Sequence, residues 1–329
     1  MNNKKINILV TGCAGFIGFH LSKELLKNKL FNVSGIDNMN SYYDIKLKKD
    51  RLSLLKKFNK FIFFKVDIEN QNKLKKIFNM GNFDYVIHLA AQAGVRHSIT
   101  EPRPYLNSNI LGFFNIIDLS RQFKIKHFLY ASTSSVYGDS NKFPLNENLD
   151  TSSPNSFYAA TKKANEVIAY SYSHIHKLKT TGLRFFTVYG PFGRPDMALY
   201  KFTESIIYKK KLDLFNRGKH IRDFTYIDDV IMAVIKLIKK PAKDKTNYQV
   251  INIGSGNPKK LSYFLEEIEK SVGSKSRKNL KSFQMGDVYK THADISKLIK
   301  KVSFKPKFEV SQGIRNFVIW YKEYFNINK

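Results

Sequence analysis

The chain has 329 residues, 43% of them hydrophobic, which is enough to bury one large core or two interleaved ones. Its single cysteine excludes a disulfide framework, and no apolar stretch reaches 18 residues, so we expect a cytoplasmic protein without a membrane partner. The net charge of +29 is mostly lysine scattered from end to end, which indicates a compositional bias. Because no recognisable reading element accompanies it, we expect no nucleic-acid partner.

The first half of the chain alternates apolar runs with helical patterns. We expect strands near 7–12, 32–37, 61–67, 85–91, 127–133 and 180–190, and helices near 16–29, 46–61, 70–80, 103–123 and 157–176. This alternation predicts an α/β fold with a doubly wound parallel sheet of Rossmann type. In the lysine-rich helix near 46–61, Leu and Phe recur at helical spacing, so its basic residues are interpreted as a solvated face.

The pattern loosens in the second half. Helices expected near 197–210, 226–239, 261–272 and 311–325 are separated by short strands and by loops rich in Gly, Pro and Asn. We therefore expect a larger domain over residues 1–187, with segments near 224–254 returning to it. A smaller, interleaved α/β domain would cover residues 188–329.

A glycine pattern lies between the first predicted strand and the first predicted helix. The segment TGCAGFIG places Gly12, Gly15 and Gly18 where glycines permit a tight turn and a close approach of backbone to a pyrophosphate. The second strand ends in Asp37, whose carboxylate would accept from ribose hydroxyls and repel a 2′-phosphate. The pattern predicts an NAD site, and Asp67, after the third strand, is expected at the adenine edge.

A tyrosine and a lysine one helical turn apart follow a cluster of hydroxyl residues. Tyr158 and Lys162 share one face of the helix predicted over 157–176, and the sequence STSS at 132–135 ends the fifth strand. The unperturbed pKa of tyrosine, about 10, is too high for a base at neutral pH. We expect the Lys162 ammonium and an oxidised nicotinamide to lower the pKa of Tyr158, which would then serve as a general base.

These segments, taken together, resemble a known enzyme family. TGCAGFIG, HLAAQAGVR, ASTSSVYG, YAATKKANE, GLRFFTVYGPFGRPDMA and RDFTYIDDV resemble the extended short-chain dehydrogenase/reductase superfamily, and within it the UDP-glucuronate 4-epimerases of the NAD-dependent epimerase/dehydratase family. The resemblance implies that Thr133, Tyr158 and Lys162 are catalytic. Tyr158 would take the proton of the sugar 4-hydroxyl while C4 passes hydride to tightly bound NAD. The 4-keto sugar would then turn over and regain the hydride on its other face.

The resemblance also assigns binding residues. The larger domain would hold NAD through Gly12, Gly15, Phe16, Ile17, Gly18, Asp37, Asn38, Asp67, Ile68, Leu89, Ala90, Ala91, Asn109, Tyr158 and Lys162. The smaller domain would bind the UDP-sugar, and the expected substrate contacts are Arg96, Ser134, Ser135, Thr187, Arg194 and Arg222. No cluster of His, Cys and Asp has the spacing of metal ligands, so no metal is expected.

The residues after Thr133 separate reaction types within the superfamily. Related dehydratases carry an Asp-Glu pair there, and UDP-glucuronate decarboxylases carry an acid nearby, whereas this chain has Ser134 and Ser135. Neutral side chains do not repel a C5 carboxylate, which favours epimerisation of UDP-glucuronate to UDP-galacturonate. The resemblance places Thr187 at a position where UDP-glucose epimerases carry Asn. A threonine in place of that Asn also suits a substrate with a C5 carboxylate.

Three alternatives stay open at this stage. They are another UDP-sugar 4-epimerase acting on UDP-glucose, UDP-galactose or N-acetyl forms, a UDP-glucuronate decarboxylase, and a non-enzymatic NAD-binding regulator or scaffold. The superfamily often pairs through two helices, so we expect a homodimer through the helices near 103–123 and 157–176. UDP-galacturonate would feed the synthesis of surface polysaccharides.

Overall fold

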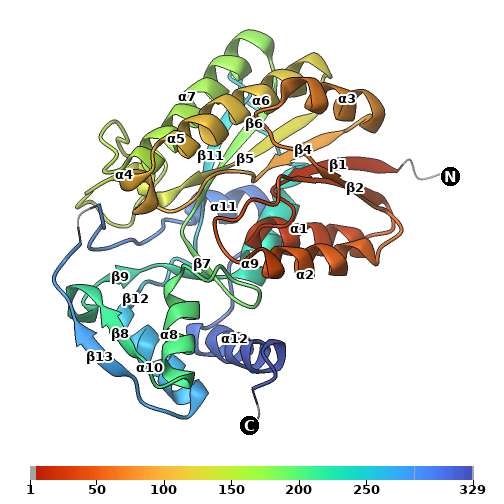
Figure 1. Ribbon diagram of the computed structural model, residues 1–329. Helices are drawn as coiled ribbons and strands as arrows, with labels where there is room; N and C mark the ends of the chain where they lie inside the picture. The colour runs from red at the N-terminus through yellow and green to blue at the C-terminus, as the bar shows by residue number, and fades with distance from the viewer. Residues whose placement is uncertain (1–4, 285, 328–329) are drawn as a thin grey trace.

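The computed structural model describes residues 5–284 and 286–327, and its centre is a parallel sheet of seven strands (Figure 1). The strands, from one edge to the other, are β3 (Phe61–Lys65), β2 (Phe31–Asp37), β1 (Ile6–Thr11), β4 (Tyr85–His88), β5 (His127–Thr133), β6 (Thr180–Phe185) and β11 (Tyr248–Ile253). Every neighbouring pair is parallel. The order 3-2-1-4-5-6 is that of a Rossmann sheet, so the predicted fold class is confirmed.

Helices cover both faces of this sheet (Figure 1). One face carries α1 (Phe16–Lys27), α2 (Ile45–Lys56) and α9 (Ile227–Ile238), and the other carries α3 (Gln71–Gly81), α6 (Phe113–Gln122) and α7 (Phe157–His176). Local sequence fixes the helix ends. At the start of α7, the Ser156 hydroxyl accepts from the Ala159 amide at 3.1 Å, and the helix ends where Lys177 takes a left-handed backbone conformation with φ of 57°.

Two expected elements are each divided in the structure. The helix expected over 103–123 consists of a short turn, α5 (Arg103–Tyr105), a π-helical segment (Leu106–Gly112) and α6. The wider π turns bring the Asn109 side chain inward, where it holds the backbone of Gln92. The strand expected over 180–190 is β6 followed by β7 (Thr187–Tyr189), which leaves the main sheet and pairs with β10 (Phe224–Tyr226).

A smaller lobe lies below the sheet in Figure 1. Its helices are α8 (Ala198–Ile207), α10 (Leu261–Val272) and α12 (Val310–Tyr324), and its strands pair as β8 (Lys211–Leu214) with β13 (Arg277–Leu280) and β9 (Ile221–Arg222) with β12 (Lys259–Lys260). Two further short helices, α4 (His97–Thr100) and α11 (Ser296–Val302), complete the list. No described helix has both the length and the apolar character needed to cross a bilayer.

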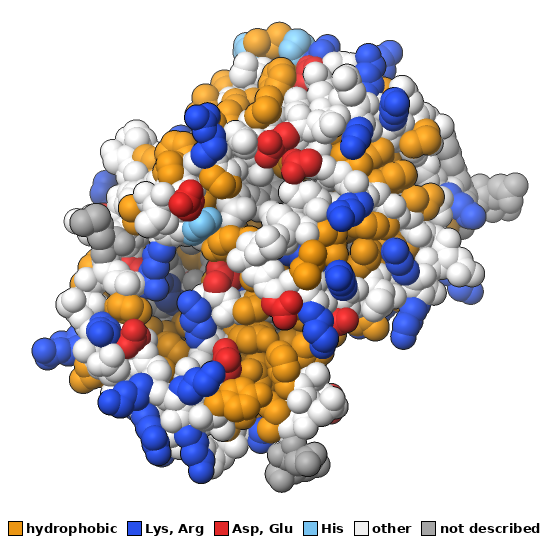
Figure 2. Space-filling view, viewed as in Figure 1, with side chains coloured by type: hydrophobic (Ala, Val, Ile, Leu, Met, Phe, Trp, Pro, Cys, Tyr) orange, Lys and Arg blue, Asp and Glu red, His pale blue; other side chains and the backbone are white. Residues whose placement is uncertain are grey.

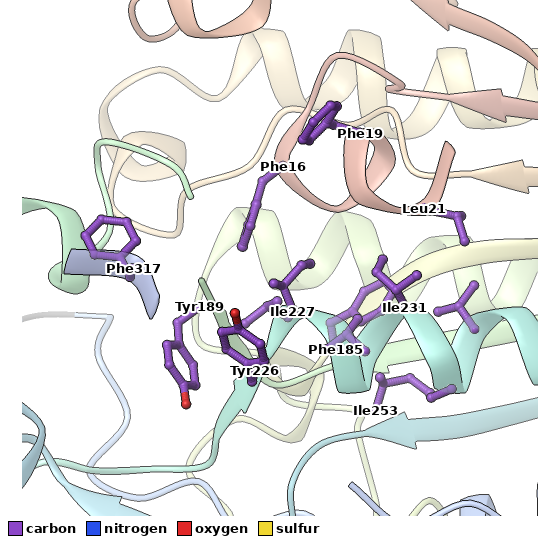
Figure 3. Close-up of a cluster of buried hydrophobic side chains, with 14 of the residues drawn as sticks. Phe16, Phe19, Leu21, Phe185, Tyr189, Tyr226, Ile227, Ile231, Ile253 and Phe317 are labelled. Carbon is purple, nitrogen blue, oxygen red and sulfur yellow. The ribbon is translucent and has the colours of Figure 1, made fainter. Parts of the chain in front are cut away.

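One hydrophobic core joins the two lobes (Figure 3). Phe16 and Phe19 of α1 and Ile231 of α9 belong to the same buried cluster as Tyr189 of β7 and Phe317 of α12. Because side chains from both lobes share this apolar interior, the lobes are held as one packed unit beneath the cleft between them.

The basic residues of α2 are not all solvated, so that expectation is wrong for two of them. Lys46 and Lys49 are exposed, but Lys48 and Arg51 are buried on the side of the helix that faces the body of the protein. Both side chains end in hydrogen bonds to backbone oxygens, which offset the cost of removing them from water. Regular spacing of Leu could not reveal partners supplied by distant loops.

Candidate active site

A cleft of about 1160 Å³ opens at the carboxyl ends of the strands, between the sheet and the smaller lobe. In a doubly wound sheet this edge is where ligands bind, because the strand order reverses there and leaves a crevice. The lining includes almost every residue singled out in the sequence, from the glycine turn after β1 to Arg222 of β9.

The glycine turn forms a cradle that side chains would fill. A Cβ added at Gly12, whose φ is +72°, would lie 2.8 Å from the Ala90 nitrogen, and one added at Gly18 would lie 2.1 Å from the Gly12 oxygen. Gly15 precedes α1, and no side chain caps that helix, which leaves its first N–H groups without side-chain partners. Free donors at a helix start beside an open cradle fit a diphosphate.

Asp37 is buried at the end of β2 and lines the cleft. Its two carboxylate oxygens accept from the backbone amides of Ala14, at 3.1 Å, and Met39, at 2.8 Å. Each oxygen retains capacity for another hydrogen bond, as a ribose diol would require. The cradle and this carboxylate together fit an NAD-type dinucleotide.

The remaining predicted cofactor residues divide into two groups. Phe16, Ile17, Asn38, Ile68, Leu89, Ala90, Ala91, Tyr158 and Lys162 line the same cleft. Asp67 and Asn109 do not line it and instead hold neighbouring segments. Asp67 accepts from the side-chain amide of Asn38 at 2.9 Å. Asn109 accepts from the Gln92 amide at 2.8 Å and donates to the Thr161 hydroxyl at 3.0 Å.

Thr133, Tyr158 and Lys162 meet on one wall of the cleft. Thr133 ends β5, Tyr158 lies in the first turn of α7, and Lys162 follows one turn later. The Lys162 ammonium donates to the Ala131 carbonyl at 3.0 Å. The Tyr158 amide donates to the Ser98 hydroxyl at 3.1 Å, which ties the start of α7 to α4. The arrangement places a phenol, a hydroxyl and an ammonium around one region of space.

Burial shifts the pKa values of both Tyr158 and Lys162, and a further cation acts on Tyr158. Burial raises the pKa of Tyr158, and the positive charge of Arg194, followed by a hydrogen bond to Thr133, opposes that rise. Burial lowers the pKa of Lys162 to about 7. The sequence did not indicate this action of the second cation, Arg194, which the fold brings from the smaller lobe and which opposes the rise in the pKa of Tyr158.

The hydroxyl cluster continues from β5 into a turn of 3-10 helix over Ser134–Tyr137. Both Ser134 and Ser135 line the cleft, as does Thr187 of β7. The Thr133 hydroxyl accepts from the Ser135 amide and donates to the Ser135 hydroxyl, each at 3.2 Å. No residue from 132 to 137 is acidic, so this segment contributes hydroxyl groups and no carboxylate to the cleft.

Arg194 has a partner that the sequence did not reveal. Its guanidinium is paired with Asp196 through Nε, at 3.0 Å, and through Nη2, and it lies over the Tyr42 ring with 5.9 Å to the centroid. The Tyr42 hydroxyl donates to the same carboxylate at 3.4 Å. The two segments that meet here are 154 residues apart in the chain, and no sequence spacing predicts that contact.

Arg96 and Arg222 lie at the far end of the cleft, around Asp287. Asp287 is 3.1 Å from Nη2 of Arg96 and 3.8 Å from Nη2 of Arg222, and the Arg96 guanidinium stacks on Phe215 with 4.8 Å to the ring centroid. Two guanidinium groups converging on one anion form a site that suits phosphate oxygens. Asp287 follows a glycine in a polar loop, and that pattern alone is too common to mark it.

Behind the hydroxyl cluster lies a buried ion pair, which sequence reasoning also missed. Arg184 of β6 donates twice to Glu166 of α7, at 2.8 Å from both Nε and Nη2. The Ser132 hydroxyl donates to the same carboxylate at 2.6 Å. This network fixes the end of β5 against α7 and so sets the position of Thr133 relative to Tyr158.

The chain is similar to a known family and to several of its members. Residues 8–254 match the family described as "NAD dependent epimerase/dehydratase family". Protein CapI of Staphylococcus aureus is 47% identical over 97% of this chain and 99% of its own length. The UDP-glucuronate 4-epimerase of Thermodesulfobacterium geofontis is 41% identical over 98% of both chains. The crystal structure of UDP-glucuronic acid 4-epimerase from Bacillus cereus, in complex with UDP-glucuronic acid and NAD, superposes with a TM-score of 0.91 at 34% identity, covering 97% of this chain and all of that one.

Proposed function

Because the chain belongs to the NAD-dependent epimerase/dehydratase family, we propose that it interconverts UDP-glucuronate and UDP-galacturonate at C4 of the sugar. The proposal rests on the hydroxyl, phenol and ammonium of Thr133, Tyr158 and Lys162, with no acid following Thr133. Relatives and a solved structure of similar length and sequence carry the name of this activity.

Tyr158 is the proposed general base for the sugar 4-hydroxyl. Its phenolate would take that proton, with Thr133 donating to the same oxygen and with Arg194 stabilising the negative charge. The chemistry that NAD would supply when bound is reversible hydride transfer at C4 of the sugar. Lys162, whose ammonium donates to the Ala131 carbonyl, would also donate to the cofactor ribose.

The hydroxyl groups that follow β5 support a uronate substrate. We propose that Ser134, Ser135 and Thr187 donate hydrogen bonds to the C5 carboxylate, which must be held because a 4-keto uronate readily loses CO2. Loss of CO2 requires the bond between C5 and the carboxylate to overlap the π orbital of the C4 carbonyl. If the carboxylate is held so that this overlap is absent, the electrons of the bond cannot form an enolate. No acid in this segment is available to assist elimination, which argues against the dehydratase and decarboxylase reactions.

The guanidinium pair at the other end of the cleft would hold the diphosphate. Arg96 and Arg222 are the proposed contacts, since the diphosphate can replace Asp287 as their anion. Arg194 is already paired with Asp196, and we assign it to the sugar end because its charge acts on Tyr158. On this proposal residues 1–187 bind the dinucleotide, with returning segments near 224–254, and residues 188–329 bind the UDP-sugar together with Arg96, Ser134, Ser135 and Thr187 of the larger domain.

We also propose a homodimer formed through α6 and α7. Seven large apolar side chains are exposed on these helices and on the π segment before them: Leu106, Leu111, Phe114, Phe157, Val167, Tyr170 and Ile175. The two helices lie side by side on the outside of the molecule (Figure 1), and orange side chains gather at the top of Figure 2 where they run. Pairing with a second copy would bury this apolar surface.

The deciding experiment is incubation of the purified protein with UDP-glucuronate and no added NAD. We expect UDP-galacturonate to accumulate without release of CO2, at a rate that Tyr158→Phe lowers by about 100-fold or more. A matched control is Tyr85→Phe, at the opposite end of the sheet. Release of CO2 would indicate a decarboxylase, and turnover of UDP-glucose in place of UDP-glucuronate would indicate another epimerase. Bound NAD without turnover of any UDP-sugar would favour a regulator.

A further inference from the structure

Arg51 of α2 is a fully buried cation whose partners are all neutral oxygens. Within residues 5–284 and 286–327 it forms no ion pair, whereas the buried Arg184 is matched by Glu166. A buried guanidinium without a carboxylate is costly unless its N–H groups are hydrogen-bonded; both Nη atoms of Arg51 are bonded, whereas its Nε has no partner among the described residues. The contacts of Arg51 therefore indicate its structural role.

The Arg51 guanidinium reaches two loops that face different halves of the cleft. Nη1 donates to the Ala14 carbonyl at 2.9 Å, within the glycine turn, and to the Tyr43 hydroxyl at 2.7 Å. Nη2 donates to the Phe192 carbonyl at 2.6 Å and approaches the Gly193 carbonyl at 3.5 Å. The two loops are about 180 residues apart in sequence and otherwise belong to different lobes.

The second loop is held in a conformation that needs support. Phe192 has a φ of +55°, which costs a residue with a side chain on the order of 1 kcal/mol or more. Its carbonyl receives the short bond from Arg51, and the neighbouring Pro191 carbonyl is 2.9 Å from Nε2 of His20 on α1. Both anchors come from the lobe that carries the glycine turn.

The residue after this loop carries the charge that acts on Tyr158. Arg194 follows Gly193 directly, and its guanidinium lines the cleft and lowers the pKa of Tyr158 against the effect of burial. If the loop moved away from Arg51, Arg194 would move with it relative to the sugar end of the cleft. Positioning errors of about 1 Å can cost roughly 100-fold in rate.

We propose that Arg51 is a positioning residue that couples the dinucleotide turn to the Arg194 loop, so that the cofactor half and the sugar half of the cleft are set by one side chain. This inference rests on the proposed function for the sugar half, while the cofactor half depends only on the family's use of NAD. Arg51 touches neither half of the cleft directly, because it is absent from the lining. It acts through Ala14 on one side and through Gly193 on the other.

The test compares three variants with the native protein. Arg51→Met removes the donors, Arg51→Lys keeps a charge that can reach one loop at a time, and Lys49→Met changes an exposed cation on the same helix. Two quantities are measured well below the thermal midpoint of each variant. The first is the NAD retained after gel filtration, and the second is the KM for UDP-glucuronate at saturating NAD.

We expect Arg51→Met to retain several-fold less NAD and to raise the KM about tenfold or more. Arg51→Lys should show smaller changes in both quantities, and Lys49→Met should match the native protein. A variant that only loses thermal stability, with both quantities unchanged, would overturn the proposal, as would a change in one quantity alone. If Arg51→Met does not fold, the same criteria apply to Arg51→Lys.

The outcome is separable from the proposed function. Native protein that binds NAD but does not turn over UDP-glucuronate would refute the epimerase assignment. In that case the sugar half is followed through binding of UDP-glucuronate by calorimetry, and the NAD retention of the variants is unaffected by the missing turnover. Reduced NAD retention together with weakened sugar binding would still support the coupling, and unchanged values would still overturn it.

Discussion

Burying the ammonium of Lys162 lowers the free energy of unfolding, and this effect can be measured apart from the proposed catalytic role of the residue. The residue is 1% exposed, its ammonium donates to the Ala131 carbonyl, and burial lowers its pKa to about 7 from an ordinary 10.5. Below pH 7 the lysine is protonated in both folded and unfolded chains, so the folded protein bears the full cost of burying the charge. Between pH 7 and 10.5 only the unfolded chain holds the proton, so stability rises with pH across that window.

We therefore expect Lys162→Met to stabilise the protein while abolishing its turnover. In protein freed of nucleotide, the gain in free energy of unfolding should be about 3 kcal/mol at pH 6. It should shrink by about 1.4 kcal/mol per pH unit between pH 7 and 9. Urea unfolding at several pH values measures the gain. The same gain at every pH would contradict the assignment to a buried ammonium.

Thr187 offers a test of selectivity between sugars. It lines the cleft from β7, and a threonine hydroxyl there suits the C5 carboxylate proposed above. Thr187→Asn should shift the ratio of kcat/KM values toward UDP-glucose and away from UDP-glucuronate by about tenfold, since a bulkier amide meets a hydroxymethyl group better than a carboxylate. Unchanged selectivity, measured with both sugars on one preparation, would remove Thr187 from the substrate site.

For individual residues, the sequence predicted site residues that stand in local motifs and missed those whose partners are distant in the chain. Gly12, Tyr158 and Lys162 stand in recognisable spacings, and the structure brings them to one cleft. Asp287 became visible only as the partner of Arg96, which is 191 residues away, and Asp196 only as the acceptor from Tyr42, which is 154 residues away. Such pairs depend on how the two lobes meet, which no local spacing encodes.

Among the elements, α7 shows where helix prediction succeeds. Its observed bounds, 157 to 176, are those expected from the sequence, because a serine cap begins it and a left-handed residue ends it. The helix expected over 103–123 lacks such signals inside it, so the π turns that move Asn109 inward were invisible. The strand over 180–190 was read as continuous, because the apolar run does not show that β7 leaves the main sheet.

The outward face of α7 is part of the proposed dimer interface. Val167 is 57% exposed in the middle of the helix, beside Tyr170. A charge placed at the centre of a paired apolar face must be buried or the pair must separate, so Val167→Glu should convert the proposed dimer to a monomer. Sedimentation analysis of the variant measures the change, and Met232→Glu, at an exposed apolar position of α9 on the other face of the sheet, controls for the added negative charge. A native protein that sediments as a monomer would contradict the dimer itself.

For the whole molecule, the net charge of +29 has a measurable kinetic consequence. Lysine and arginine side chains crowd the lower lobe in Figure 2, and Lys201, Lys210 and Lys211 line the cleft. The proposed substrate carries a diphosphate and a carboxylate, so these cations should speed its approach.

We expect kcat/KM to fall several-fold between about 0.02 M and about 0.3 M salt, because the screening length shortens from about 20 Å to below 10 Å. The value of kcat should change little. Lys211→Gln should reduce the salt dependence, while Lys75→Gln on α3, away from the cleft, should not. A kcat/KM that is independent of salt would assign the charge to composition alone.

The fold as a whole followed from the alternation of strands and helices, and the seven-stranded parallel sheet agrees with it. The packing of the smaller lobe did not follow, because its strands are as short as two residues and its sheets hold two strands each. Tertiary contacts decide such elements, and local propensity is too weak to do so.

The position of β11 at the edge of the main sheet has a consequence for dissecting the molecule. The chain leaves the sheet after Phe185 at the end of β6 and builds part of the lower lobe. It returns at Tyr248, where β11 lies beside β6, before it leaves again. A gene cut once after residue 187 would therefore give two fragments, one lacking its outermost strand and the other carrying that strand without a sheet. Neither half can be expected to survive alone, so binding of dinucleotide and sugar must be dissected by substitutions within the intact chain.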